Sequence, residues 1–422
     1  MPLIPGSRPG PYDIPPSLWL DRADRPRFDD FAGPVTADVC VVGGGISGVA
    51  LTWFLRERGV SVALVERDGI ASAASGRNAG FLLAGLASPY LELIEQWGRE
   101  RARAALALSA ENREWTARLI QEEKIACDHA RHGAWVLAGS EEEARALRES
   151  AALQAEDGLP GTWHEAARLP APYAGREAFH GGLFVAGDGE LDPARFVWGL
   201  AERARARRAK VFEGAGVRGW SDEPGGVRIE CAGGRRVSAG AIVLATNAWF
   251  PELLPETASW TAPKRAQMLA TAPLPRRVFD HPTYARDGYD YWRQTLDGRV
   301  LVGGFRDQDL EREVGYDARP TVTIQNHLDG FLREMGLSSA EHPAPVTHRW
   351  AGIMDFTLDG LPLVGRVPGR EHVFLLGGYT GHGMGWAVAC ARGLSEMLCA
   401  PASTRLAQGI CDPARLSSPA RV

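Results

Sequence analysis

A glycine-rich segment close to the N-terminus constrains the fold of this chain more than any other feature. A run of apolar residues leads into Gly43, Gly45 and Gly48, and apolar residues then recur at helical spacing up to residue 55. The order is that of a buried strand, a tight turn and a helix, and the glycine spacing matches the dinucleotide-binding pattern G-x-G-x-x-G. In that pattern Gly43 makes the sharp turn, Gly45 lets the backbone approach a pyrophosphate, and Gly48 lets the helix pack closely on the strand. The N–H groups at the helix N-terminus would then face the phosphates.

The residues that follow the glycines strengthen this interpretation, because a chain with 49 glycines contains such patterns by chance. The helix should run from about Ile46 to Arg58 and end at Gly59, a typical C-terminal cap. A second apolar strand then ends in Glu66, close to the spacing of roughly 20 residues at which an acid binds the ribose diol. The alternative is a glycine-rich strand–helix–strand corner in which Glu66 is merely solvated.

Composition limits the class of protein. With 422 residues the chain exceeds one ordinary hydrophobic core, so two domains are expected. The net charge of −5 gives no reason to expect nucleic acid or an anionic membrane as a partner. No run of about 18 apolar residues indicates a transmembrane span, and the proline-rich residues 1–16 do not resemble a secretory signal.

The six cysteines are scattered, without a C-x-x-C pair or a Cys/His cluster at metal-ligand spacing, so no metal site is expected. Cys40 and Cys390 lie in apolar segments and are expected to be core thiols. This pattern favours a reducing compartment, and we expect the protein to be cytoplasmic.

The periodicity predicts strands alternating with helices at both ends of the chain, and antiparallel strands between them. Residues 241–249 form a continuous apolar run, as expected for a parallel strand buried on both faces. Asp297 and Gly298 are typical of a hairpin turn, and Asp192 and Pro193 of a helix start. Helices are expected at 89–124, 141–154, 194–208, 323–335 and 384–398, and strands at 133–138, 210–217, 227–232, 265–273, 289–294, 299–305 and 373–378.

Seven stretches, in this order along the chain, resemble one family. They are Gly43-x-Gly45-x-x-Gly48 with Glu66, Ser75-Gly-Arg-Asn-Ala-Gly80, Leu191-Asp-Pro193, Ala245-Thr-Asn-Ala248, Tyr291-Trp-Arg-Gln294 with Gly303-Gly304, Thr357-Leu-Asp-Gly-Leu-Pro-Leu-Val-Gly365, and Gly377-Gly-Tyr-Thr-Gly-His-Gly383. Over about residues 15–398 the chain resembles the D-amino-acid oxidase/glycine oxidase/sarcosine oxidase family of FAD-dependent oxidoreductases, most of all the branch that contains gamma-glutamylputrescine oxidase.

The resemblance implies an α/β fold in which a Rossmann-like FAD-binding domain of the glutathione-reductase type is interleaved with an α+β substrate domain whose sheet is mainly antiparallel. Residues 1–88, 178–258 and 346–422 are expected to form the FAD-binding domain, and residues 89–177 and 259–345 the substrate-binding domain. The resemblance also implies oxidation of the C–N bond of an amine or amino acid by hydride transfer to flavin N5. The imine would be hydrolysed to a carbonyl compound, and oxygen or another acceptor would reoxidise the flavin.

The cofactor residues follow from matching the family motifs position by position. The turn at residues 43–48 would hold the pyrophosphate, Glu66 and Arg67 the adenosine end, and Val217 the adenine through its backbone. Arg77 would donate hydrogen bonds near the flavin, although an ordinary surface salt bridge is the alternative. The full expected set is Gly43, Gly44, Gly45, Ile46, Ser47, Gly48, Glu66, Arg67, Ser75, Arg77, Asn78, Ala79, Gly80, Val217, Ala245, Thr246, Trp249, Gly352, Asp359, Gly378, Tyr379, Gly381, His382, Gly383 and Met384.

The turn at residues 377–383 leads into the last predicted helix, whose N-terminal N–H groups would face the N1/C2=O edge of the flavin. That edge becomes negative on reduction, so the helix end would favour the reduced form. His382 could add positive charge there, with a structural histidine as the alternative. Two attachment points of relatives are missing, because residues 349–356 contain no cysteine and residues 71–81 no histidine. Non-covalent FAD is therefore expected.

The candidates for the catalytic site are Arg293, Tyr291, Trp350 and His382. Tyr291 and Arg293 alternate along one predicted strand and should share a face. In the amino-acid oxidases an arginine on the comparable strand clamps the substrate carboxylate, a task that suits a bidentate guanidinium. The alternative is that Arg293 pairs with an acid at the domain edge. Trp350 could wall the flavin face or be an ordinary core tryptophan.

Several questions stay open at this point. Related sarcosine oxidases use one lysine for the substrate carboxylate and another for oxygen, and this chain has Gly385-Trp386 and residues 299–302 without lysine there. An FAD-dependent monooxygenase or halogenase shares the first motif and would consume NAD(P)H. A flavoprotein subunit of a larger complex is a third reading. Neither the identity of the amine nor the oligomeric state follows from the sequence.

Overall fold

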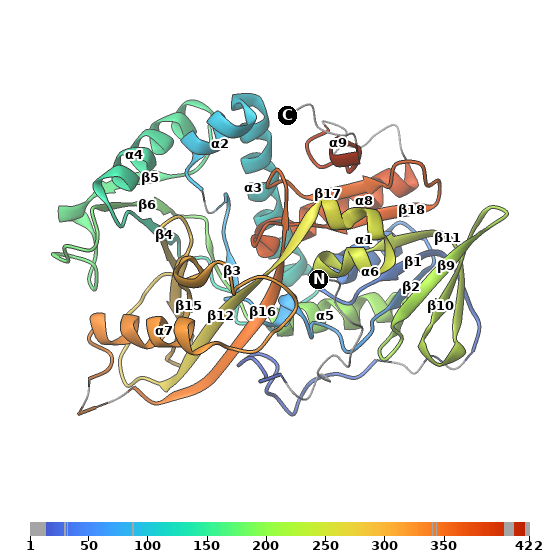
Figure 1. Ribbon diagram of the computed structural model, residues 1–422, viewed down its shortest axis with the longest axis horizontal. Helices are drawn as coiled ribbons and strands as arrows, with labels where there is room; N and C mark the ends of the chain where they lie inside the picture. The colour runs from blue at the N-terminus through green and yellow to red at the C-terminus, as the bar shows by residue number, and fades with distance from the viewer. Residues whose placement is uncertain are drawn as a thin grey trace.

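Two large β-sheets organise the molecule (Figure 1). The computed structural model describes residues 14–28, 31, 33–86, 88–339, 341–342, 344–400 and 409–417. The sheet that contains the first strand, β1 (Val35–Val42), lies on the right of Figure 1, and the sheet that contains the long strand β12 (Thr261–Pro273) lies on the left. Each sheet is assembled from segments far apart in sequence, so the chain passes between the sheets several times.

The first sheet is built around a parallel core. β1 pairs in parallel with β11 (Arg236–Leu244) on one side and β2 (Val62–Val65) on the other. Its order is β17-β18-β11-β1-β2-β8, with the β9–β10 hairpin attached to β11. The other strands are β8 (Lys210–Phe212), β9 (Val217–Glu223), β10 (Gly226–Cys231), β17 (Leu363–Arg366) and β18 (Val373–Gly377). The predicted Rossmann-like domain is confirmed. Of the strand predicted at 241–249, residues 241–244 are the second half of β11, and residues 247–249 form a 3-10 turn instead.

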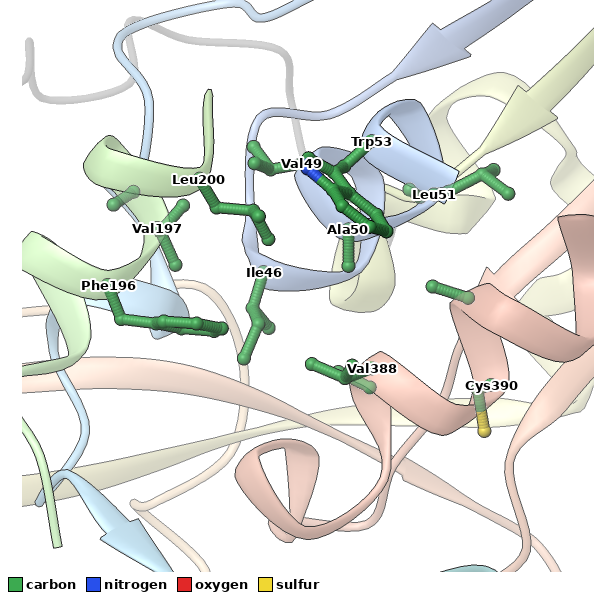
Figure 2. Packing of buried hydrophobic residues seen from close by; sticks show 14 of the residues in the cluster. Ile46, Val49, Ala50, Leu51, Trp53, Phe196, Val197, Leu200, Val388 and Cys390 are labelled. Carbon is green, nitrogen blue, oxygen red and sulfur yellow. The ribbon is translucent and has the colours of Figure 1, made fainter. Parts of the chain in front are cut away.

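Helix α1 (Ile46–Glu57) follows β1 directly and is packed between α5 (Pro193–Ala206) and α8 (Ala387–Cys399). Figure 2 shows Ile46 of α1 directed toward Phe196 of α5 and Val388 of α8, and all three are buried. The predicted helix signals are in place as well. The Asp192 carboxylate caps α5 by accepting a hydrogen bond from the Arg195 amide. Two neighbouring helices therefore fix where α1 begins, at the glycine turn.

The second sheet is mainly antiparallel, as expected, with the order β16-β12-β15-β14-β13-β4-β6-β5. β13 and β4 pair in parallel. Helix α7 (Val322–Glu334) packs on one face, with Ile324 and Leu328 in the same apolar cluster as Trp292. The remaining strands are β4 (Ala134–Leu137), β5 (Thr162–Glu165), β6 (Gly181–Val185), β13 (Thr283–Ala285), β14 (Asp290–Gln294), β15 (Arg299–Gly304) and β16 (Val346–Thr357).

Smaller elements complete the fold. β3 (Phe81–Leu82) and β7 (Gly189–Glu190) form a separate two-stranded sheet. The other helices are α2 (Tyr90–Trp97), α3 (Arg99–Glu122), α4 (Glu141–Glu156), α6 (Phe250–Leu253) and α9 (Ala414–Ser417). None of the helices in the described ranges combines the length and apolar character needed to cross a membrane.

The structure differs from the sequence expectations at two helices. The helix predicted at 89–124 is two helices, because Gly98 adopts a φ of +82° that breaks the helical path. The helix predicted at 384–398 begins at Ala387, because residues 383–385 first form a 3-10 turn. The first amide groups of α8 therefore lie further along the chain than predicted.

Two segments in the predicted FAD-binding domain, β6 and β16, hydrogen-bond within the second sheet. We propose that both belong with the substrate domain. The division would then change at about residue 186 and at about residue 358, and the rest of the predicted boundaries would stand.

Candidate active site

A single cavity of about 580 Å³ is lined by both sheets. It touches the glycine turn after β1, the loop after β2, the ends of β11 and β18, and one face of the second sheet. The residues predicted from sequence that line it are Gly43, Gly45, Ile46, Ser47, Glu66, Arg67, Ser75, Arg77, Asn78, Ala79, Val217, Ala245, Thr246, Trp249, Tyr291, Gly352, Tyr379, Gly381, His382, Gly383 and Met384.

The glycine turn has the geometry that its spacing predicts. Gly43 has a φ of +113°, and a Cβ there would lie 2.6 Å from the Ala245 carbonyl oxygen. A Cβ on Gly48 would lie 2.0 Å from the Gly43 carbonyl oxygen, so α1 packs on the turn more closely than any other residue permits. A Cβ on Gly45 would meet only the Ser75 side chain, and Gly45 itself lines the cavity. This position is therefore left clear for a ligand.

Glu66 ends β2 and its carboxylate reaches back to the glycine turn. It accepts hydrogen bonds from the Gly44 amide at 2.6 Å and from the Asp68 amide at 2.8 Å. Burial raises the pKa of Glu66, and the two amide bonds oppose that shift. The carboxylate is thus held at the strand end, where the sequence places the acid for a ribose diol. Beside it, Arg67 stacks on Trp249, with 5.4 Å between the guanidinium carbon and the ring centre.

The loop at residues 71–81 crosses the middle of the cavity and is held by its own side chains. The Ser75 hydroxyl accepts a hydrogen bond from the Ile46 amide at 2.8 Å, at the start of α1. The Asn78 side chain bonds the Ala74 and Ser75 carbonyl oxygens and the Gly80 amide. Ser75 and Asn78 therefore hold the loop in shape. Arg77 is the charged residue of this loop.

Arg77 is a half-buried cation without an acid. Its guanidinium donates to the carbonyl oxygens of Ser72, Pro15 and Ala351, at 3.0–3.1 Å. No acidic side chain in the described ranges forms an ion pair with it, so the surface salt bridge weighed from sequence is not what the structure contains. Burial lowers the pKa of Arg77 to about 10, which leaves it charged at neutral pH. A positive charge held this way against a cavity favours an anionic ligand.

The glycine turn near the other end of the chain closes the cavity. The Tyr379 hydroxyl and the Ser47 hydroxyl lie 2.8 Å apart, which joins this turn to the first turn of α1. Thr380 has a φ of +48°, a conformation that β-branched residues rarely adopt. Gly381 follows with a φ of +82°. Strained backbone of this kind gathers at functional sites.

The N-terminal amides of α8 have a partner other than the predicted flavin. The Asn112 side chain of α3 accepts hydrogen bonds from the Val388 amide at 2.8 Å and the Ala389 amide at 3.2 Å. Its NH₂ group donates to the Met384 carbonyl oxygen at 2.8 Å. The cavity is lined instead by the turn before the helix, residues 381–385.

His382 lines the cavity but does not supply the positive charge that the sequence suggested. Its ring lies 5.6 Å from the ring of Tyr284. Burial lowers the pKa of His382 to about 4, and no acid in the described ranges compensates. This lowered pKa argues against the positive charge weighed from sequence, and a contact between His382 and the flavin stays a prediction.

Arg293 lies outside the cavity lining. It shares a strand face with Tyr291 as predicted, but Trp19, Glu190 and Leu191 cover it. Its guanidinium lies 3.3 Å from the Glu190 carboxylate, donates to the Leu191 carbonyl oxygen at 3.0 Å and stacks on Trp19. The pairing with an acid that was weighed from sequence is the arrangement present. Arg293 is thus engaged beneath the 78–81 loop and has no free edge toward the cavity.

Other predicted positions also lie behind the lining. Trp350 is fully buried, and its indole N–H donates to the Arg77 carbonyl oxygen at 2.9 Å. The Asp359 carboxylate pairs with Arg415 at 2.6 Å. The predicted residues outside the lining are Gly44, Gly48, Gly80, Arg293, Trp350, Asp359 and Gly378. These residues support the site rather than face its contents.

The second sheet contributes cavity residues that the sequence analysis did not identify. Tyr284 lies beside Phe81 and Tyr291, with ring centres 5.1 Å and 5.8 Å away. Arg306 lies two residues beyond the end of β15, and that position was the one available signal, since only Phe305 separates it from the Gly303-Gly304 pair. The further lining residues on this side are Ala266, Asp287, Gly288, Tyr289, Gly304, Met354, Asp355 and Phe356.

Two polar groups on the lining, the Thr246 hydroxyl and the Asp355 carboxylate, are buried without a hydrogen bond of ordinary geometry in the described ranges. Burial raises the pKa of Asp355 to about 7, and weak contacts with the Thr261 hydroxyl and the Phe356 amide oppose that shift. Unsatisfied buried polar groups are costly, so each calls for a partner that the protein chain does not supply.

A dinucleotide with a pyrophosphate fits this cavity. Gly45 leaves space beside the start of α1, Arg77 supplies an uncompensated cation, and Thr246 offers an unsatisfied hydroxyl. Glu66 stands at the end of the adjacent strand, where an adenosine ribose is expected. No group of three or more metal-ligating side chains occurs within the ranges described.

Comparison with known proteins identifies the family. Residues 38–397 match the family model DAO, described as FAD dependent oxidoreductase, so the chain belongs to this family. The protein is an FAD-dependent oxidoreductase.

Individual relatives are distant but cover most of the chain. The chain is 27% identical to "Probable oxidoreductase OrdL" of Rhizobium meliloti, over 90% of this chain and 87% of that protein. It is 27% identical to "Gamma-glutamylputrescine oxidoreductase" of Escherichia coli, over 88% of this chain and 85% of that protein. Among solved structures, L-proline dehydrogenase from P. horikoshii is similar in fold, with a TM-score of 0.76 and 21% identity over 90% of this chain and 98% of that chain.

Proposed function

We propose that this protein oxidises the C–N bond of an amine or amino acid, with FAD held non-covalently in the cavity described above. One observation carries the proposal. The same cavity joins the Gly43–Gly48 turn, the turn at residues 381–385 and the aromatic face of the second sheet. A cofactor that spans the first two would end against the third, where a small substrate has room.

The roles of the cavity residues follow from their contacts. The turn at residues 43–47 and the N-terminus of α1 would hold the pyrophosphate, with Glu66 and Val217 at the adenosine end. Arg77 would stabilise the anionic centre of the cofactor, and the turn at residues 379–384 would hold the flavin end. No cysteine lines the cavity within the described ranges, which supports non-covalent binding.

FAD, when bound, would supply the hydride acceptor. An amine oxidised at the carbon that bears its nitrogen would become an imine, and water would hydrolyse that imine to a carbonyl compound and ammonia or a smaller amine. Tyr284, Tyr291 and Tyr289 line the protein side of the cavity, where their hydroxyls and rings can contact an amine. The neutral His382 can accept or donate a hydrogen bond there without adding charge. The relatives named as acting on an amino acid or on gamma-glutamylputrescine support the same substrate class.

Two finer points are part of the proposal. Oxygen or another electron acceptor reoxidises the flavin, and the protein acts in the cytoplasm. The six cysteines support the second point, since none of them is in a disulfide and five are buried.

Anaerobic reduction of the bound flavin tests the proposal. The purified holoprotein is mixed without oxygen with D-amino acids, N-methyl amino acids and polyamine derivatives, and flavin absorbance is followed. Bleaching by at least one amine is expected, and rapid recolouring with peroxide on admission of air would identify oxygen as the acceptor. Steady NAD(P)H consumption without any amine would instead identify a monooxygenase. A flavin that no amine bleaches would contradict the proposal and favour a subunit of a larger complex.

A further inference from the structure

Arg306 stands where the second sheet meets the cavity. It begins the 3-10 turn Arg306–Asp309 directly after β15 and Phe305, and it lines the cavity. Phe305 has a φ of +58°, which is rare for a residue with a side chain. The chain leaves the sheet through this strained residue, and the next side chain is Arg306. Its position is therefore set by the fold and not by a freely moving loop.

Two aromatic rings hold the Arg306 guanidinium. Its central carbon lies 5.1 Å from the centre of the Tyr289 ring and 5.0 Å from the centre of the Phe356 ring. Both rings line the same cavity. Cation–π contacts engage the faces of a guanidinium, so the N–H groups along its edge stay available as donors.

No group in the described ranges satisfies those donors, since Arg306 takes part in no hydrogen bond and no ion pair there. The acids next to it in sequence are engaged elsewhere. The Asp307 carboxylate lies 3.1 Å from Arg286, and that of Asp309 lies 4.0 Å from Arg312.

A second cation adds to the positive charge at this wall of the cavity. The Lys264 ammonium lies 4.5 Å from the centre of the Phe356 ring, on which Arg306 also stacks. Burial and the charge of Arg306 lower the pKa of Lys264. The wall thus places a guanidinium held between two rings beside a second positive group. The carboxylates of Asp287 and Asp355 also line the cavity, and neither forms an ion pair with Arg306 in the described ranges.

We propose that Arg306 binds a carboxylate of the substrate, through the edge of a guanidinium that Tyr289 and Phe356 hold in place. The substrate is then an amine that carries an acidic group, and Arg306 determines that preference. Arg293, the arginine that the sequence pattern suggested, lies outside the cavity lining, where it pairs with Glu190 and donates to the Leu191 carbonyl oxygen. The inference rests on the proposed function, because it concerns the substrate end of the same cavity.

A binding experiment tests Arg306 separately from catalysis. Holoprotein is titrated with butanoate and, in parallel, with butanamide, which has nearly the same shape without the negative charge. Binding is followed by the flavin absorbance spectrum and by the shift in thermal unfolding. Butanoate should bind the wild-type protein, and Arg306→Gln should weaken it roughly 10- to 100-fold, the range for one charged hydrogen-bonded pair. Arg306→Lys should give an intermediate affinity, since it keeps the charge but not the planar fork.

Arg312→Gln is the matched control. It removes the same charge three residues beyond the end of that turn, but its side chain is largely exposed and lies outside the cavity lining. Its butanoate affinity should equal that of the wild type. Circular dichroism and the FAD content of each variant report whether it is folded. If Arg306→Gln does not fold, the butanoate affinity of Arg306→Lys tests the proposal instead.

A reduction experiment tests the same residue with substrates. Flavin bleaching rates are compared for alanine, proline and N-methylglycine and for the carboxamide of each. The wild type should prefer the acids, and Arg306→Gln should lose most of that preference by reducing the rate with the acids alone. An unchanged preference in Arg306→Gln would overturn the proposal, as would a wild type that prefers the carboxamides.

The two proposals fail in different ways. If no compound bleaches the flavin but butanoate binds and Arg306→Gln abolishes that binding, the oxidation proposal fails and the Arg306 site stands. If amines bleach the flavin but butanoate does not bind, the Arg306 proposal fails and the oxidation proposal stands.

Discussion

The two ends of the cavity are formed by different parts of the chain, backbone at one end and side chains at the other. At the nucleotide end, the backbone forms the site, through the turn that contains Gly43 and Gly48 and the N-terminus of α1. At the substrate end, side chains from separate strands and turns form it, among them Tyr284, Tyr291 and Arg306. A backbone site needs a few glycines at fixed spacing, whereas a side-chain site depends on which strands the fold brings together. The nucleotide end can therefore be predicted from the sequence, whereas the substrate end can be identified only from the three-dimensional structure.

The largest effect should follow from a change at the nucleotide end. In Gly48→Ala the new methyl group would lie 2.0 Å from the Gly43 carbonyl oxygen, an overlap of backbone that no side-chain movement relieves. The cost should be roughly 3 kcal/mol or more, and the variant should be purified largely without FAD. Flavin absorbance per protein measures this. Gly219→Ala, where nothing lies within 4 Å, is the control and should retain FAD. Full retention in Gly48→Ala would contradict a site made by backbone contact.

The next effect concerns Asp355 on the wall of the second sheet. Its carboxyl ionises near pH 3.8 when unfolded and near pH 7 when buried, so between these values the native state binds more protons than the unfolded state. Stability should therefore fall as pH rises through this window and level off above about pH 7. Asp355→Asn removes this dependence. Relative to the wild type it should gain up to roughly 4 kcal/mol between pH 4 and pH 8.

Urea unfolding of the holoprotein at several pH values checks that expectation. Asp222→Asn, on the exposed face of the β9–β10 hairpin, is the control for a carboxylate-to-amide change. A difference between Asp355→Asn and the wild type that does not vary with pH would mean that the cofactor or another partner satisfies Asp355.

Arg77 lies between the two ends, and its removal should have an intermediate effect. Arg77→Gln removes the one uncompensated charge of the middle loop, at a cost of about 1.5–3 kcal/mol in cofactor binding. The dissociation constant for FAD should rise roughly 10- to 150-fold. Titration of apoprotein with FAD, followed by quenching of flavin fluorescence, measures this. Arg77→Lys should recover part of the affinity, and equal losses in both variants would indicate that Arg77 acts only through its bonds to Ser72, Pro15 and Ala351.

The smallest effect is expected at His382. Because burial lowers its pKa to about 4, the imidazole does not change charge between pH 6 and pH 9. His382→Asn should therefore leave the shape of the pH profile for flavin reduction unchanged over that range, even if the rate changes. The loss of an ionisation between pH 6 and pH 9 in the variant would show that His382 is charged in the working enzyme.

Much of the fold and of the nucleotide end could be predicted because the signals are local. The turn of Gly43, the acid at Glu66 and the cap at Asp192 each depend on a few neighbouring residues. Alternation also placed Tyr291 and Arg293 on one face of β14.

The rest depends on contacts between distant segments. The fate of Arg293 is decided by Trp19 and Glu190, which lie more than 100 residues away in the chain and cover it. The neutral state of His382 follows from burial, which composition does not report. Arg306 is not part of a recognisable sequence motif. What distinguishes it is that no carboxylate in the described ranges forms an ion pair with it. Sequence periodicity has no means of registering such an absence.

The hydrogen bond between Ser47 and Tyr379 has a consequence for how the protein is made. It joins residues 332 positions apart, so the two turns that enclose the cofactor are synthesised at opposite ends of translation. The nucleotide-binding turn can fold on the ribosome as soon as its strands emerge, but the cavity stays open until the last glycine turn is released. Stable flavin capture is then a late event, and a chain truncated before Tyr379 would contain the dinucleotide motif without a closed cofactor site.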